Sequence, residues 1–323
     1  MVRARVGVAG LAVALILAGC AAPTVSSPAP GRTPGTAPAS AGSAPATALP
    51  ATVPPADLPT DLPSPVSSFM PSTVATFAPA GASAATWDLV ALGDSNVSGW
   101  GVRTDEPYSP QAAFPGVYAG LLGAEQGVTV VLHSYYPDQL GNEWRTIAEW
   151  TDVLRADASM RADLAGAEIV VVLIGFHDLL PFVLGGACPS GWPELRDCLV
   201  DMTASMPADF DTLYGEIASL VPTGATVLVN DYGIPGPTYD RWSSESFWPE
   251  FRKVFFEDWR DGLEAAAVKH GFTVVHSYAA MNDPDGKPVW DSSAVTSDGW
   301  HFNAEGHRIC AEIILAEDGF SAP

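Results

Sequence analysis

Beyond residue 84 the chain alternates short apolar runs with longer segments of helical periodicity. Five of the runs are nearly continuous in Val, Ile and Leu, as is typical of parallel strands that are covered on both faces. They span residues 86–92, 128–134, 168–175, 226–232 and 272–278. Because helical segments separate these runs, the pattern predicts an α/β domain over residues 84–323. We expect a three-layer α/β/α arrangement, in which helices cover both faces of a central, mostly parallel five-stranded sheet.

The clearest predicted helix covers residues 247–270. Large apolar side chains recur there at every fourth position, which gives one apolar stripe along a helix: Phe247, Phe251, Phe255, Trp259 and Leu263. The stripe could face a cofactor, but packing into the core is the simpler interpretation and the one we favour.

The N-terminus has the features of an export signal. Arg3 and Arg5 precede an apolar stretch, Val6–Leu17, that is too short to span a membrane comfortably. The stretch ends in Leu17-Ala18-Gly19-Cys20, which resembles the lipobox of bacterial lipoproteins, although an ordinary secretory signal is the alternative. We therefore predict a signal peptide over residues 1–19, a lipidated Cys20, and attachment to the outer face of the cell membrane through that lipid.

Residues 20–83 consist mainly of Pro, Ala, Ser and Thr and carry few charges. Such a segment cannot bury enough apolar surface to offset its ordering entropy. The composition predicts a disordered tether between the lipid anchor and the folded domain.

Three cysteines follow the tether: Cys188, Cys198 and Cys310. An exported protein can keep disulfides, and three pairings are possible. Cys188 and Cys198 flank one Pro- and Gly-rich loop, so we predict that they form the bridge. We expect Cys310, in a C-terminal helix, to be a buried thiol. The chain has no Cys-x-x-Cys pattern, which argues against a zinc site.

Composition narrows the range of partners. The chain of 323 residues has 47% hydrophobic residues and a net charge of −22, with only 15 Lys and Arg against 37 Asp and Glu. Binding to a phosphate backbone needs clustered Lys and Arg, so nucleic acid is excluded as an expected partner. We expect a monomer.

Reactive side chains follow two of the predicted strands. The first strand ends in Gly93-Asp94-Ser95-Asn96, the third in Gly175-Phe176-His177-Asp178, and Asp298 precedes His301 near the C-terminus. In parallel sheets, functional loops follow the carboxyl ends of strands. A serine hydroxyl needs a base, and an Asp three residues before a histidine can orient that histidine. The Gly-x-Ser-x-Gly pattern is absent because Val97 occupies the last position.

These motifs resemble those of the SGNH, or GDSL, hydrolases. Gly93-Asp94-Ser95 matches the first block of that family, Asp298-Gly299-Trp300-His301 matches the last block, and residues 175–178 match the third block except at its Asn. The resemblance runs from about Thr86 to the C-terminus. It implies a flavodoxin-like fold and a serine esterase or lipase that needs no cofactor.

The resemblance also implies roles for individual residues. Ser95 would attack an ester carbonyl, His301 would act as general base and then as general acid, and Asp298 would orient His301. The oxyanion hole would comprise the Ser95 N–H, a glycine of the second block and the third-block side chain. Gly141 is the available glycine, although it lies further from its strand than the family usually places it. The alternative role for Gly141 is to form a turn.

His177 stands where the family has Asn. Either its ring supplies a substitute N–H donor, or the donor is lost and the protein is slow or inactive. We favour substitution. We expect Asp94 and Asp178 to brace their loops, and His133 and His307 to be structural. A metal site formed by His177, Asp178, His301 and His307 is conceivable, but no compact ligand spacing supports it.

The expected substrate is a small-molecule ester or an ester of the cell envelope, either an acyl lipid or an acetylated glycan. Four aromatic residues flank the motifs and could line a pocket or simply pack: Trp100, Phe176, Trp192 and Trp300. Three alternatives remain open at this point: an acyltransferase, a metal-dependent hydrolase, and a binding lipoprotein with little or no turnover.

Overall fold

A computed structural model describes residues 73–81, 85–102, 108–136, 145–183, 187–189, 191–233 and 236–320. The predicted signal peptide, Cys20 and Gly141 lie outside the described residues, as does the predicted tether up to residue 72.

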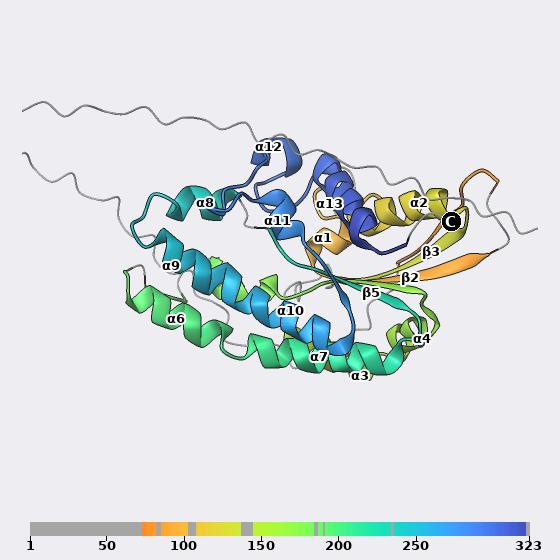
Figure 1. Cartoon of the computed structure of the whole chain (residues 1–323), viewed down its shortest axis with the longest axis horizontal. Helices are drawn as coiled ribbons and strands as arrows, with labels where there is room; N and C mark the ends of the chain where they lie inside the picture. The colour runs from red at the N-terminus through yellow and green to blue at the C-terminus, as the bar shows by residue number, and fades with distance from the viewer. Residues whose placement is uncertain are drawn as a thin grey trace, which may run out of the picture. The chain divides into compact units, whose positions relative to one another are not determined.

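Six strands form one sheet in the order β1-β3-β2-β4-β5-β6 (Figure 1). All neighbours are parallel except β1, which pairs antiparallel with β3. The five predicted strands are confirmed. The strands are β1 Thr73–Phe77, β2 Thr86–Gly93, β3 Thr129–Tyr135, β4 Ile169–Leu173, β5 Thr226–Asn230 and β6 Thr273–Val275.

The additional strand corrects two predictions. The sheet has six strands rather than five, and β1 lies inside the range 20–83 that was predicted to be a disordered tether. β1 is a short edge strand whose Val74 is 55% exposed, while Phe77 packs against the core. So few inward-facing apolar side chains give almost no signal in a sequence. Backbone pairing with β3 defines this strand.

Helices cover both faces of the sheet (Figure 1). The side chains of β2 alternate between these faces: Leu89 and Ala91 join the core beneath α2 and α13, whereas Val90 and Leu92 join the core beneath α3, α7 and α10. The helical elements are α1 Ser95–Ser98, α2 Phe114–Gln126, α3 Ile147–Ala156, α4 Ala158–Gly166, η1 Phe176–Leu179, α5 Leu180–Val183, α6 Glu194–Thr203, α7 Met206–Leu220, α8 Gly236–Trp242, α9 Trp248–Arg252, η2 Lys253–Glu257, α10 Asp258–His270, α11 Ser277–Met281, α12 Ser292–Val295 and α13 Ala304–Glu317.

The predicted helix over residues 247–270 is continuous but contains a π-helical segment. α9 passes into the π segment η2 and then into α10, and the aromatic stripe is buried in the core as predicted. A period of four residues drifts by about 40° per step around an α-helix of 3.6 residues per turn. The wider π turn reduces this drift, so Phe251, Phe255 and Trp259 all stay in the core.

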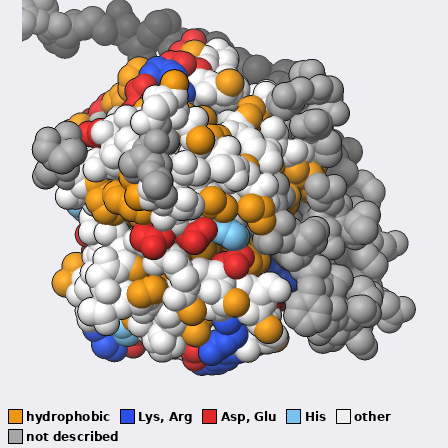
Figure 2. Space-filling view, turned by 90° about the vertical axis from the view of Figure 1, so that its right-hand side faces the viewer, with side chains coloured by type: hydrophobic (Ala, Val, Ile, Leu, Met, Phe, Trp, Pro, Cys, Tyr) orange, Lys and Arg blue, Asp and Glu red, His pale blue; other side chains and the backbone are white. Residues whose placement is uncertain are grey.

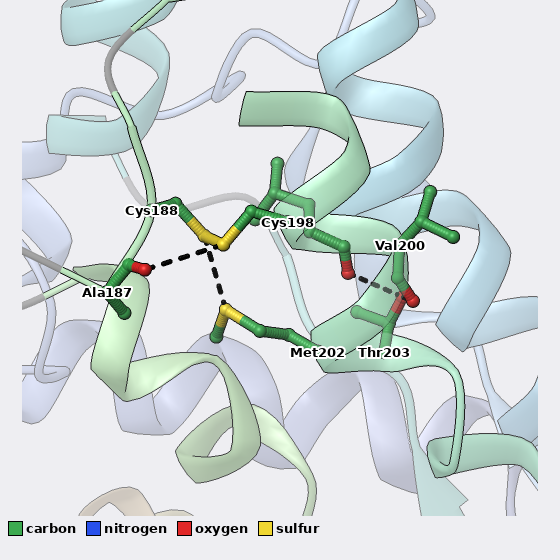
Figure 3. The surroundings of a disulfide bond; sticks show 7 residues. Ala187, Cys188, Cys198, Val200, Met202 and Thr203 are labelled. Carbon is green, nitrogen blue, oxygen red and sulfur yellow. Dashed lines mark hydrogen bonds between the residues drawn. A yellow bond between two sulfur atoms is a disulfide. The ribbon is translucent and has the colours of Figure 1, made fainter. Parts of the chain in front are cut away.

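The predicted disulfide joins Cys188 to Cys198, with a Cα–Cα distance of 5.7 Å (Figure 3). The bridge joins the middle of α6 to the segment before this helix, and the Met202 sulfur lies 3.4 Å from the Cys188 sulfur. Cys310 is a buried free thiol on α13, and burial raises its pKa to about 12. It therefore stays protonated and acts as a small apolar side chain.

On the face drawn in Figure 2, several Asp and Glu side chains gather beside a histidine. His133 on β3 lies between two carboxylates, with Nε2 3.2 Å from Asp88 and Nδ1 3.0 Å from Asp163. These two contacts are consistent with its predicted structural role.

Among the described helices, none is long and apolar enough to cross a membrane.

Candidate active site

Ser95 lies at the sharp turn where β2 ends. Gly93 closes the strand at a point where there is no room for a side chain, because a Cβ there would lie 2.5 Å from the Leu173 carbonyl oxygen. Asp94 caps the one-turn helix α1, whose first residue is Ser95. The Ser95 N–H donates to no acceptor among the described residues. Ser95 thus lies at the carboxyl edge of the sheet, where the functional loops of parallel sheets gather.

Asp94 braces this turn, as predicted. Its Oδ1 accepts from the Asn96 N–H at 2.9 Å, and its Oδ2 accepts from the Tyr232 hydroxyl. That hydroxyl lies also 3.2 Å from the Leu173 carbonyl oxygen. Burial and the charge of Asp94 raise the pKa of Tyr232 well above its usual value, so the phenol remains a donor. Tyr232 was predicted only as the end of a strand, and its role depends on a contact across the sheet.

The loop after α12 holds Asp298 against His301. The Asp298 Oδ2 lies 2.6 Å from the His301 Nδ1, and its Oδ1 accepts from the backbone N–H groups of Trp300 at 2.9 Å and His301 at 2.8 Å. Gly299 permits this tight loop with a φ of +90°. The spacing Asp-x-x-His thus brings the two side chains together as the sequence predicts.

The electrostatics of this pair favour a carboxylate. Partial burial works against the charged form of Asp298. The backbone N–H of His301, the His301 ring and the Trp300 N–H outweigh that effect, and the pKa of Asp298 lies below its usual value. A carboxylate on Nδ1 leaves the opposite ring nitrogen, Nε2, as the group that can take up a proton.

The nucleophile turn and the histidine loop meet through the neighbours of Ser95 and His301. The Asn96 Oδ1 accepts from the Phe302 N–H at 3.1 Å, and the Trp100 and His301 rings have centroids 6.1 Å apart. No hydrogen bond joins the Ser95 hydroxyl to the His301 ring among the described residues. Such contacts are often long in unliganded sites.

His177 and Asp178 lie on η1, directly after β4, and both contact the start of α3. The His177 Nδ1 accepts from the Arg145 N–H at 3.2 Å, and the Asp178 Oδ2 accepts from the Ile147 N–H at 3.1 Å. A neutral His177 ring that accepts at Nδ1 carries its proton on Nε2. Desolvation by burial raises the pKa of Asp178 to about 7.

His307, on α13, packs in the core beneath the site, as predicted. It is fully buried, its Nδ1 accepts from the Phe114 N–H at 3.0 Å, and its ring lies edge-on to Phe302. Burial and the nearby His301 lower the pKa of His307 to about 3. The ring is therefore neutral at ordinary pH. The side-chain cap of α13 is Asn303.

The aromatic residues near the motifs separate into two groups. Phe176 lies between Tyr232 and Trp300, with ring centroids 5.6 Å and 6.0 Å away, so these rings border the site. Trp192, in contrast, stacks on Phe247 with centroids 5.0 Å apart and belongs to the packing of α6 and α9.

A shallow cavity of about 380 Å³ lies next to Asp298. It is lined by glycines, hydroxyls and carboxylates: Gly236, Asp240, Ser293, Thr296, Ser297, Asp298 and Gly299. This lining contains no cation.

One group of described side chains has the spacing of a metal site, and it differs from the set considered in the sequence. Asp231, Glu264 and His276 could share one ion. Arg260 already lies there, with its Nε 3.7 Å from Asp231 and 3.5 Å from Glu264. The Arg260 guanidinium thus supplies the positive charge that a metal ion would bring to these carboxylates.

Comparison with known proteins agrees with this architecture. The sequence pattern of the GDSL-like lipase/acylhydrolase family matches residues 91–309, which is more than half of the chain, and the protein belongs to that family. Membership supports ester hydrolysis as the general class of reaction. The match includes Ser95, His177, Asp298 and His301.

A solved structure shares this fold at low sequence identity. The lipase Lip_vut3 from a goat rumen metagenome is 15% identical, with a TM-score of 0.54 over 72% of this chain and 97% of its own. A carbohydrate acetylesterase family member from Sinorhizobium meliloti is also 15% identical, with a TM-score of 0.37 over 71% of this chain and 95% of its own. The comparison with curated proteins finds no match.

Proposed function

We propose that the protein is a serine ester hydrolase in which Ser95, His301 and Asp298 form the catalytic triad. The observation that supports this proposal most directly is the Asp298–His301 pair at 2.6 Å, on a loop hydrogen-bonded to the Ser95 turn. His301 would take the proton from the Ser95 hydroxyl as Ser95 attacks the ester carbonyl. It would then return that proton to the departing alcohol, and a water would release the acyl group by the reverse sequence.

His177 is proposed as a donor to the oxyanion in place of the usual Asn. Its Nδ1 accepts from the Arg145 backbone, which leaves the proton on Nε2 as the group that can donate. The Ser95 N–H would be a second donor, and Gly141 a third. Loss of one such donor typically lowers the rate by about 100- to 1,000-fold. We therefore expect His177→Ala to lose turnover by this factor and His177→Asn to retain much of it.

The proposed place of action is the outer face of a bacterial membrane, with a lipid on Cys20 and residues up to 72 as the tether. The support is the sequence Leu17-Ala18-Gly19-Cys20 after an apolar segment. Full-length protein should fractionate with membranes, and Cys20→Ala should not incorporate labelled fatty acid. Labelling of Cys20→Ala at the wild-type level would refute the anchor.

The hydrolase proposal can be tested with a fluorophosphonate probe and a panel of aryl esters from acetyl to long acyl chains. Wild type should label and turn over at least one ester, whereas Ser95→Ala should do neither. Wild type that does not label would favour a ligand-binding protein with this fold. The acyl length that gives the highest kcat/KM then separates a deacetylase from a lipase.

A further inference from the structure

Asn96 connects the two halves of the candidate site. Its backbone N–H donates to the Asp94 Oδ1 at 2.9 Å, and its side-chain Oδ1 accepts from the Phe302 N–H at 3.1 Å. Ser95 precedes Asn96 directly, and His301 precedes Phe302 directly. One side chain thus joins the residue after the nucleophile to the residue after the base, across 206 positions of sequence.

Several further backbone contacts of the histidine loop lie within the loop. The Ser297 N–H donates to the His301 carbonyl at 2.8 Å, and Thr296 and Phe302 form an isolated β-bridge. These contacts fix the shape of the loop but not its place relative to Ser95. The hydrogen bond from Phe302 to Asn96 is a direct polar contact between this loop and the Ser95 turn, and it acts beside the ring contacts of His301 with Trp100 and of Trp300 with Phe176. The Ser95 hydroxyl and the His301 ring have no direct hydrogen bond among the described residues.

We propose that Asn96 is a positioning residue that sets the distance and orientation of His301 relative to Ser95. The inference rests on the proposed hydrolase function. The Phe302 N–H belongs to the peptide that follows His301, so fixing this group fixes the backbone from which the imidazole projects. Asn96 in turn belongs to α1, whose first residue is Ser95. Misplacement of reacting groups by about 1 Å can lower a rate by about 100-fold.

The role requires an acceptor at this position rather than a side chain of a certain shape. Leu has nearly the size of Asn but would leave the Phe302 N–H unpaired. Asp has the same shape and still accepts, but it adds a negative charge beside the His301 loop. That charge favours the protonated imidazole, so the acidic limb of the pH–rate profile should move to higher pH.

The test compares Asn96→Leu and Asn96→Asp with wild type and with Ser95→Ala. The readouts are kcat and KM for the best aryl ester, and the rate of fluorophosphonate labelling, each measured across pH. Asn96→Leu should lose about 10- to 100-fold in kcat and in labelling rate, with KM changed less than about 3-fold. Asn96→Asp should recover to within about 5-fold of wild type at a pH above its displaced acidic limb.

A stability control separates positioning from general damage to the fold. Asp157 caps α4 through its contacts with Ser159 and Met160, so Asp157→Ala should lower the melting temperature while labelling at 25 °C stays at the wild-type rate. Asn96→Leu with kcat within 2-fold of wild type would overturn the proposal. So would Asn96→Asp that fails as badly as Asn96→Leu at every pH.

The proposed hydrolase function is tested separately, by comparing wild type with Ser95→Ala. Labelling of wild type but not of Ser95→Ala supports the proposed function whatever the Asn96 variants do. A wild type that neither labels nor turns over any ester would overturn both the function and the positioning role.

Discussion

Asp178 should make the stability of the protein fall as the pH rises from about 4 to about 7. The carboxyl lies on η1 and accepts a hydrogen bond from the Ile147 N–H, which works against a raised pKa. Burial nonetheless dominates, and the nearby Asp209 and Glu149 add to it, so the pKa of Asp178 rises to about 7. In an unfolded chain the same carboxyl titrates near 3.8.

The sign follows from proton linkage. Between about pH 4 and pH 7 the folded state keeps the proton on Asp178 while the unfolded state has released it. The free energy of unfolding therefore decreases with rising pH over this window. At about 1.4 kcal/mol for each unit of pKa, a rise from 3.8 to about 7 corresponds to a loss of up to about 4 kcal/mol.

Asp178→Asn removes this titration and leaves a carbonyl that can accept from the Ile147 N–H. The assay is urea unfolding of both proteins between pH 4 and pH 8.5. The two should be about equally stable near pH 4, and the variant should be more stable by about 2–4 kcal/mol above pH 7.5. A difference that stays constant with pH would refute the reasoning.

Asp211→Asn is a control of opposite sign. Hydrogen bonds from Lys269 and His270 lower the pKa of Asp211, so this exposed carboxylate stabilises the fold when it is charged. Its replacement should be destabilising at neutral pH, with an effect that shrinks as the pH falls below 4.

Three further predictions concern the scaffold. Gly93→Ala should lower the free energy of unfolding by about 3 kcal/mol, measured in urea, because its Cβ would lie 2.5 Å from the Leu173 carbonyl oxygen; a change below about 0.5 kcal/mol would contradict this. Replacing Cys188 and Cys198 with Ser should cost about 2–3 kcal/mol in the same assay, and reduced wild type should match the variant. The pKa of His307 is lowered from 6.5 to about 3, so wild type should lose stability as the pH falls below about 6.5. His307→Asn lacks this titration, and its free energy of unfolding should fall less than that of wild type below pH 5. Parallel pH profiles of the two proteins would contradict this.

Much of the candidate site could be predicted because its contacts are local in sequence. Asp298 and His301 are three residues apart, and a loop of that length brings the carboxylate to the ring. The turn at Gly93 follows a strand that is apolar on both faces, so it lies at the carboxyl edge of the sheet. The disulfide closes a short loop for the same reason.

Other parts of the site were hidden because they depend on contacts between distant segments. The sequence motif indicates no partner for Asn96, whereas the fold places its side-chain Oδ1 on the Phe302 N–H. Tyr232 reaches Asp94 from the next-but-one strand of the sheet. The tautomer of His177 is set by a backbone N–H that precedes α3.

The sequence by itself determined the α/β class, the five parallel strands and the residues proposed for catalysis. These features arise from the periodicity of buried residues and from motifs of a few consecutive residues, and both signals are local in the sequence. The tertiary structure alone decided that residues 73–77 join the sheet, and that the His177 Nδ1 accepts from the Arg145 N–H. It also decided that Asn96 joins the serine turn to the histidine loop. Each of these depends on a backbone hydrogen bond to a distant partner, and a backbone N–H or C=O is the same at every residue except proline, so no residue type identifies that partner in advance.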